Sequence, residues 1–239
     1  MKHINFKDII LYEDDNLIVV NKPAFLPSLD ERNGEGQNLL RMAKVYCEDA
    51  QLCHRLDRET SGVLVIAKNA EAYRHMSMQF ENRKVDKTYH AVVDGVVRFD
   101  KLTVDLPIKV DKSNRVNIDM KDGKPALTHF NTLEFFNKFS LIECKPVTGR
   151  MHQIRIHLAS QNAVITGDTA YRGNMPLLSK LKRNYSFSKW DVEQPIVKRF
   201  LLHAAKISFT APDEKQLTIE APYAKDFEAF LKIVKRNDL

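Results

Sequence analysis

The sequence contains few of the residues that mark disulfide-rich, metal-binding or membrane proteins. Its three cysteines, Cys47, Cys53 and Cys144, fit neither a disulfide framework nor a CxxC or zinc pattern, so we expect reduced, mostly buried thiols and no metal. No run approaches the roughly 18 apolar residues of a membrane helix, and the N-terminus lacks the apolar core and cleavage site of a signal peptide. These absences predict a cytoplasmic protein without a membrane partner.

Repeats, linkers and phosphate loops are also missing. We find no internal repeat, no low-complexity tract, no Pro/Gly/Ser linker and no glycine-rich phosphate loop. A long coiled-coil pattern or extended apolar stripe is absent too, which favours a monomer. Because 44% of the 239 residues are hydrophobic, the chain can bury a substantial core, and we expect a single domain over residues 1–239.

The positive charge is concentrated in one part of the chain. The net charge is +6, but residues 1–50 hold nine acids and six bases, whereas residues 151–200 hold eight bases and three acids. The basic stretch includes "LLSKLKRNYSFSKW", where Lys182 and Arg183 lie among other cations and three aromatic residues. Such a mixture suits phosphates and stacked bases. On this feature alone, a solvated loop whose aromatic rings pack on the core is the better explanation.

Strands predominate in the hydrophobic pattern, with helices interspersed among them. Closely spaced strands with polar turns fill residues 86–147, and the other expected strands and helices do not alternate strictly. The sequence therefore predicts an α+β fold with a mixed, mainly antiparallel central sheet and flanking helices, and not a doubly wound parallel sheet. The remaining expected elements are a hairpin at 9–23, helices at 38–49, 69–83, 149–163 and 224–236, and strands at 62–68, 199–210 and 215–222.

A carboxylate between two arginines opens one of the strands. In "HRLDRETSGVLVIAK", residues 54–68, Asp57 lies between Arg55 and Arg58 in a segment typical of a turn. A catalytic role would require a partner that keeps the carboxylate ionised, and the basic segment "GRMHQIRIH" offers Arg155. A guanidinium bonded to Asp57 would lower its pKa and orient one oxygen. Spacing alone leaves both interpretations open, and the second segment could equally be a phosphate site or a surface helix.

Two long motifs carry a resemblance to a known family. "HRLDRETSGVLVIAK" resembles the HRLDxxTSGLLLxAK signature of the RluA-type family of RNA pseudouridine synthases, and "GRMHQIRIHLA" is similar to that family's GRTHQIRVHLA. Shorter matches follow in order from about residue 9 to 223: "NKP", "KTYHAVVDG", "GKPALTHF", "GDTAY" and "LLHA". The resemblance implies the pseudouridine synthase catalytic fold and the isomerisation of uridine within RNA. The bond from the sugar to N1 breaks and C5 is joined to the same carbon, without a cofactor or metal.

The resemblance also implies roles for particular residues. Asp57 is the catalytic carboxylate, which either attacks the sugar carbon or removes a sugar proton. Tyr89 would stack near the base and assist loss of the C5 proton, although an ordinary strand aromatic is the alternative. Arg155 is expected to pair with Asp57, and Arg150 is the weaker candidate. We expect no catalytic role for His54.

Other residues are expected to bind the RNA. The enzyme must flip the uridine out of folded RNA, and the family's inserted arginine falls on Arg55, whose alternative role is a salt bridge. Leu202 matches a position that packs against the flipped base, although a core leucine explains it nearly as well. Lys182 and Arg183 represent the basic segment 172–190.

Two departures and two rival functions remain. Phe25 stands where the family usually has glycine, and Met151 replaces a threonine. The core motifs start too early for an N-terminal S4-type RNA-binding domain, so we expect the catalytic domain itself to select a structured ribosomal or transfer RNA. The first rival is an inactive RNA-binding or assembly factor. The second is a nucleoside or glycoside hydrolase, for which Glu59 is the only second acid near Asp57.

Overall fold

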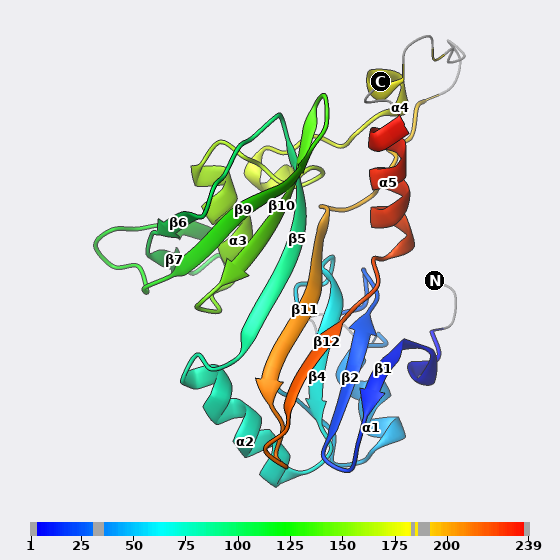
Figure 1. Cartoon of the computed structure of the whole chain (residues 1–239), viewed down its shortest axis with the longest axis vertical. Coiled ribbons are helices and arrows are strands. Elements are labelled where there is room, and N and C mark those ends of the chain that lie inside the picture. The colour runs from blue at the N-terminus through cyan, green and yellow to red at the C-terminus, as the bar shows by residue number, and fades with distance from the viewer. Residues whose placement is uncertain (1–3, 31–35, 183–184, 186–191, 237–239) are drawn as a thin grey trace. The chain divides into compact units, whose positions relative to one another are not determined.

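The computed structural model describes residues 4–30, 36–182, 185 and 192–236 (Figure 1). The chain forms two compact units. Unit 1 comprises Met1–Tyr89 and His203–Ala224, and unit 2 comprises His90–Leu202 and Lys225–Leu239. Each unit is therefore assembled from segments distant in the sequence, and the single catalytic domain remains a prediction.

Unit 1 is built on a mainly antiparallel sheet. The strand order is β1 (Ile10–Glu13), β2 (Leu17–Lys22), β4 (Ser61–Ala67) and β11 (Leu202–Thr210), with β12 (Gln216–Glu220) on β11 and the short β3 (Gln51–Leu52) on β4. All these pairs are antiparallel except β4 with β11, which run parallel with His203 opposite Ser61 and Ala204 opposite Gly62. The predicted hairpin at 9–23 is confirmed.

Two helices of unit 1 begin at asparagine caps. The side chain of Asn38 accepts from Arg41 N at the start of α1 (Leu39–Tyr46), and Asn69 accepts from Ala72 N at the start of α2 (Ala70–Glu81). Such caps satisfy amide groups that the first helical turn leaves without partners. Both helices were predicted, and together with β2 and β4 they enclose the apolar core of unit 1.

Helix α2 buries a polar side chain together with apolar ones. Gln79 is buried with Ala72 and Met76, whereas Tyr73 is exposed. Gln79 can be buried because its amide oxygen accepts from Thr210 N at 3.0 Å, so the side chain substitutes for a missing sheet partner.

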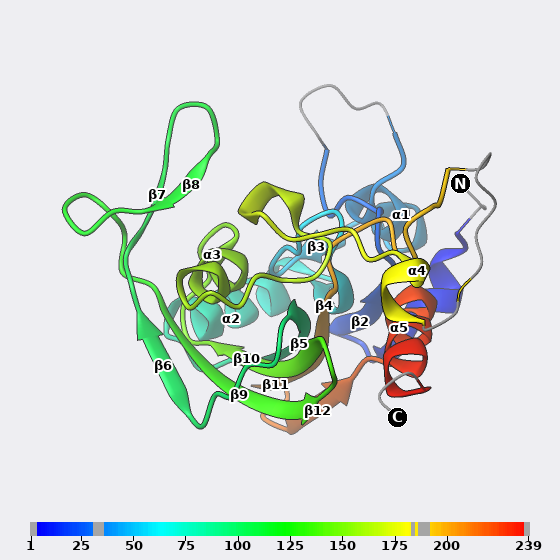
Figure 2. The same ribbon diagram turned by 90° about the horizontal axis from the view of Figure 1, so that it is seen from above.

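Unit 2 contains a second group of strands. The order is β5 (Asp86–Asp94), β10 (Phe139–Pro146), β9 (Leu127–Phe135) and β6 (Leu102–Asp105), with β10, β9 and β6 antiparallel to one another. A separate hairpin of β7 (Ile108–Val110) and β8 (Val116–Ile118) extends away from these strands (Figure 2). The helices are α3 (Gln153–Ser160), α4 (Leu178–Leu181) and α5 (Lys225–Arg236).

The fold class expected from the sequence is confirmed. The sheet is mainly antiparallel, with β4 and β11 as a parallel pair, and helices flank it, as expected for an α+β protein. The helix expected at 149–163 is shorter, because it begins only at Gln153. Among the described residues, no helix is both long enough and apolar enough to cross a membrane.

Candidate active site

Asp57 lies in a tight loop that joins β3 to β4. Pairing of Leu52 with Ile66 brings the two ends of the loop together, and Cys53 N donates to Val65 O at 3.0 Å. Within the loop, Thr60 N donates to Asp57 O at 3.1 Å, which closes a turn around the half-buried Asp57. The turn predicted from the sequence is therefore present, and it places the carboxylate directly before a fully buried strand.

A buried lysine ties this loop to the end of β2. Lys22 is fully buried, and its Nζ donates to the carbonyl oxygens of Pro23 at 3.1 Å, Leu26 at 2.9 Å and Arg58 at 3.2 Å. A buried charge is tolerated when its donors are satisfied in this way. The lysine of the "NKP" motif thus supports the backbone on both sides of the Asp57 loop, a role the sequence did not assign to it.

Two further contacts hold the same pair of segments together. Phe25 N donates to Arg58 O at 2.8 Å. The Ser28 hydroxyl donates to Leu56 O at 2.8 Å and accepts from Leu56 N at 3.2 Å. Residues 23–28 and the Asp57 loop therefore form one main-chain framework.

Phe25 keeps the backbone conformation that glycine adopts readily. Its φ is 67°, in the left-handed region that disfavours residues with a Cβ. The departure from the family pattern at this position thus changes the side chain while the backbone remains in the region typical of glycine. The hydrogen bond from Phe25 N to Arg58 O fixes that conformation.

Gly62 allows β4 to approach β11 closely. Its φ is +115°, and a Cβ built there would lie 2.2 Å from the carbonyl oxygen of Ala204 and 2.6 Å from its nitrogen. Only glycine avoids both the backbone strain and this collision. The glycine in "TSG" is therefore required by the strand that follows the Asp57 loop.

Tyr89 and Asp57 are electrostatically coupled within unit 1. Tyr89 lies in the first half of β5 and packs against the core. Burial raises the pKa of its phenol, and the negative charge of Asp57 raises it further. Tyr89 therefore keeps its proton at neutral pH.

His54 has a structural role, in agreement with the sequence prediction. Its Nε2 accepts from Val65 N at 3.1 Å, and its ring lies 4.9 Å from that of Phe80. Burial, with a smaller effect from the charge of Lys87, lowers the pKa of His54 to about 3. The neutral imidazole can therefore accept the strand hydrogen bond throughout the physiological range.

Arg155, in unit 2, is fixed by a buried carboxylate. Its Nε and Nη2 donate to the two oxygens of Asp168 at 2.7 and 2.8 Å, and both side chains are at most 7% exposed. The guanidinium also lies 4.2 Å from the ring centroid of Phe200 and 5.1 Å from that of Tyr171. Such a bidentate, stacked geometry holds an arginine in a single orientation. Asp168 belongs to "GDTAY", which was noticed in the sequence without a role.

Arg150 lies in the turn before α3 and not on the helix. Its N donates to Gln153 Oε1 at 3.0 Å, and its Nε donates to Pro125 O at 3.1 Å. His152, which lies between Arg150 and the first residue of α3, adopts the left-handed conformation with φ 54° and ends the turn. The helix expected from residue 149 therefore begins only after His152, which precedes the first helical turn.

The remaining candidates differ in exposure. Leu202 is buried at the start of β11, and its carbonyl accepts from the buried Arg199. Arg55 and Lys182 are exposed, and within the described part of the chain the Arg55 side chain has no ion-pair or hydrogen-bond partner. Arg183 lies outside the described residues.

The structure thus brings Asp57 and Tyr89 together in unit 1, and places Arg150, Arg155 and Leu202 in unit 2. A pairing of Arg155 with Asp57 would join the two units and remains a prediction. Lys22 and Asp168 were missed as functional residues, although their motifs provided a signal.

Comparison with known proteins adds independent information. The family model described as RNA pseudouridylate synthase matches residues 16–160. Ribosomal large subunit pseudouridine synthase D of Neisseria meningitidis serogroup A is 35% identical over 237 residues, which is 95% of this chain and 61% of that protein. Synthase C of Buchnera aphidicola is 36% identical over 239 residues, 96% of this chain and 71% of that protein. The chain thus spans less than two thirds of the length of the first relative and slightly more than two thirds of the length of the second.

Solved structures show the same fold. The structure of human RNA Pseudouridylate Synthase Domain Containing 4 superimposes with a TM-score of 0.74 at 26% identity, covering 96% of this chain and 94% of that one. Human RNA Pseudouridylate Synthase Domain Containing 1 gives a TM-score of 0.71 at 23% identity, covering 96% and 90%.

Proposed function

The chain belongs to the RNA pseudouridylate synthase family, and from that premise we propose that it converts specific uridines of ribosomal RNA to pseudouridine with Asp57 as the catalytic carboxylate. The observation that carries the proposal is the Asp57 loop, whose main chain is held by Lys22, Phe25 and Ser28 and whose carboxylate raises the pKa of Tyr89 through its charge. The names of the relatives support ribosomal RNA as the substrate, and with it a cytoplasmic location. Transfer RNA and a monomeric state remain predictions.

The reaction rearranges one nucleotide without gaining or losing atoms. Asp57 would either attack the sugar carbon, which breaks the carbon–N1 bond and leaves a uracil anion, or remove a sugar proton, so that loss of the uracil anion leaves a double bond in the sugar. The uracil then turns and C5 bonds to the same sugar carbon, while the Asp57–carbon bond breaks or the sugar regains its proton. The proton on C5 leaves, and N1 takes up a proton. Because main-chain contacts hold the Asp57 loop, the carboxylate is already positioned for this step, which lowers the activation free energy.

Tyr89 would cover the base during the rearrangement. Because burial and the charge of Asp57 raise its pKa, the phenol is protonated at neutral pH. It can therefore stack on the uracil and donate a hydrogen bond, whereas accepting the C5 proton would first require that it lose its own. This is a more restricted role than the one expected from the sequence.

Two arginines would serve different purposes. Arg55 is exposed and has no partner among the described residues, so it is available to enter the RNA stack when the uridine flips out, a step that costs a few kcal/mol. Arg155 is held by Asp168 and stacked on Phe200, so its guanidinium provides a positive charge at a fixed position. We propose that the Arg155 guanidinium is the partner of Asp57 in the complex with RNA.

The test is carbodiimide and primer-extension mapping of pseudouridine in total RNA of the source cell. The gene is deleted and restored as wild type, Asp57→Ala or Glu59→Gln. We expect one or a few ribosomal sites to disappear on deletion and to return with wild type and Glu59→Gln. Asp57→Ala should restore none, since no other group replaces the carboxylate.

Each alternative function has its own outcome. If Asp57→Ala restores every site, or no site depends on the gene, the catalytic proposal fails and an RNA-binding or assembly role replaces it. If purified protein releases free uracil from RNA, the chain is a hydrolase, and loss of that activity in Glu59→Gln would identify the second acid.

A further inference from the structure

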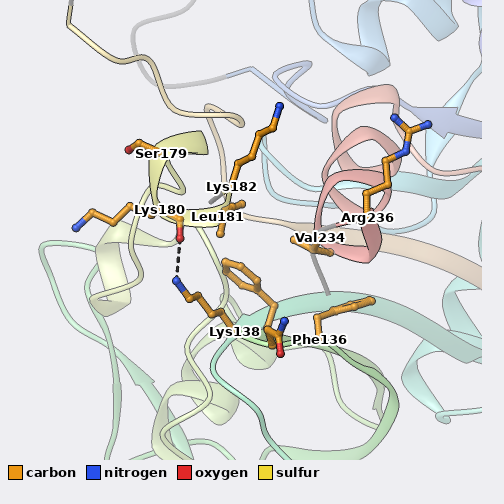
Figure 3. Close-up of a pocket in the computed structure, with 10 residues that line it drawn as sticks. Phe136, Lys138, Ser179, Lys180, Leu181, Lys182, Val234 and Arg236 are labelled. Carbon is orange, nitrogen blue, oxygen red and sulfur yellow. Dashed lines mark hydrogen bonds between the residues drawn. The ribbon is translucent and has the colours of Figure 1, made fainter. Parts of the chain in front are cut away.

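A hollow in unit 2 lies apart from the residues assigned to the reaction. It measures about 650 Å³ and is formed by the turn between β9 and β10, by α4 with the residue that follows it, and by the last turns of α5 (Figure 3). Its volume is within the range of about 300–1,000 Å³ typical of ligand sites. None of Asp57, Tyr89 and Arg155 lines it. The lining residues are Phe136, Asn137, Lys138, Phe139, Ser179, Lys180, Leu181, Lys182, Val234 and Arg236.

The inner wall of this hollow is apolar and already formed. Phe136 and Val234 are each 4% exposed and Phe139 is 8% exposed, so the surrounding protein fixes all three. Phe139 packs edge-on against Phe230 of α5 with ring centroids 5.2 Å apart. The half-buried Leu181 faces Val234 across the hollow (Figure 3). The hollow therefore combines a rigid apolar floor with polar groups of its lining.

The outer edge carries positive charge. Lys182 and Arg236 extend from opposite sides, with their charged ends toward the same side of the hollow (Figure 3). Both are exposed, and within the described part of the chain neither forms an ion pair. Lys138 has a different role, because its Nζ donates to Lys180 O at 2.8 Å and thereby ties α4 to the β9–β10 turn.

No carboxylate is among the described residues that line the hollow. Two acids nearby have partners: Glu193 accepts from the backbone N and the hydroxyl of Ser179, and Glu134 pairs with Lys235 at 2.8 Å. Lys182 and Arg236, beside apolar side chains, therefore present a site for an anion that also has a flat apolar part.

We propose that this hollow binds an unpaired nucleotide of the RNA substrate other than the uridine that reacts. The phosphate would lie between Lys182 and Arg236, and the base or ribose would contact Leu181 and the apolar wall. The proposal depends on the proposed function for the identity of the ligand as RNA. The hollow would strengthen the binding of the RNA, whereas Asp57 would carry out the chemical step.

The experiment compares two charge-matched double variants. Lys182→Gln/Arg236→Gln removes the two cations of the hollow, and Lys145→Gln/Lys232→Gln removes two cations that are already paired with Glu143 and Glu228. Binding to protein-free large-subunit ribosomal RNA from the deletion strain is measured between 0.05 and 0.3 M salt, chosen as roughly the range where phosphate contacts dominate. The rate of pseudouridine formation is measured in single turnover with saturating enzyme.

We expect the hollow variant to lose about tenfold in affinity at 0.15 M salt, and its plot of log affinity against log salt to be less steep by about 0.7–0.9, since that is what one phosphate contact contributes. Its single-turnover rate should stay within about twofold of wild type, a factor below 0.5 kcal/mol. The control should match wild type in both. Leu181→Gln should weaken binding at an unchanged slope, because it alters the apolar contact alone.

Equal affinity and slope in wild type and the hollow variant would overturn the proposal, as would equal losses in the two double variants. A loss in the hollow variant without any effect of Leu181→Gln would overturn the contact with the base or ribose. Failure of the proposed function is separate: wild type and Asp57→Ala would then both bind RNA without forming pseudouridine.

Discussion

Replacing Gly62 by alanine provides the sharpest test of how β4 carries the Asp57 loop. The added Cβ would lie 2.2 Å from Ala204 O, 2.6 Å from Ala204 N and 2.7 Å from Ala204 C, all of them backbone atoms that cannot move without breaking the parallel pairing. Overpacking of this kind costs about 1–3 kcal/mol, and the φ of +115° adds about 1–3 kcal/mol for a residue with a Cβ. We expect Gly62→Ala to lose about 3–5 kcal/mol in the free energy of unfolding.

Two other glycines separate the two contributions. Gly95 has φ +91° with nothing within 4 Å of a built Cβ, so Gly95→Ala should show the conformational cost alone, about 1–3 kcal/mol. Gly149 has open space and no positive φ, so Gly149→Ala should be neutral or slightly stabilising. The free energies come from urea unfolding followed by fluorescence. If Gly62→Ala cost no more than Gly95→Ala, the close approach of β4 to β11 would be wrong.

Two further predictions concern a buried histidine and a buried ion pair. The folded pKa of His54 is about 3 against about 6.5 unfolded, so its contribution is complete above pH 6.5 and is lost as the pH falls toward 3. In urea unfolding, wild type should lose about 2 kcal/mol more free energy of unfolding between pH 7.5 and 5 than His54→Gln loses. The control His129→Gln, at an exposed position, should lose as much as wild type. Equal losses in wild type and His54→Gln would contradict the lowered pKa of His54. Asp168→Asn should lower the free energy of unfolding by about 3–5 kcal/mol, because Arg155 stays buried and charged. Glu228→Gln, in an exposed pair, should lower it by less than about 1 kcal/mol. A similarly small loss in both variants would show that the Arg155–Asp168 pair is not critical for stability.

The order of elements could be read from the sequence because local signals agreed there. The asparagine caps at Asn38 and Asn69, the polar turn of the first hairpin and the continuous apolar run of β4 each fixed one element. The prediction of the family is also confirmed, since it rested on two long motifs in the correct order. These features depend on residues close together in the chain.

The errors arose where a distant residue decided the outcome. Gln79 is buried because Thr210, far along the chain, supplies its partner, and no helical periodicity could indicate that. Helix α3 starts only at Gln153, because the Gln153 side chain binds Leu127 O, the Thr148 hydroxyl and the amide of Arg150 and so holds the preceding residues in a turn. Likewise, the role of Asp168 follows only when "GDTAY" is brought next to Arg155.

The framework around Asp57 has a consequence for how this enzyme can change over time. The contacts from Lys22, Phe25 and Ser28 all reach main-chain atoms of Leu56 and Arg58. The path of the loop is thus set independently of the exposed side chain at position 55. Under the proposed function, a mutation at position 55 would change a contact to RNA while the Asp57 carboxylate stays in place, so that substrate preference could vary without rebuilding the loop.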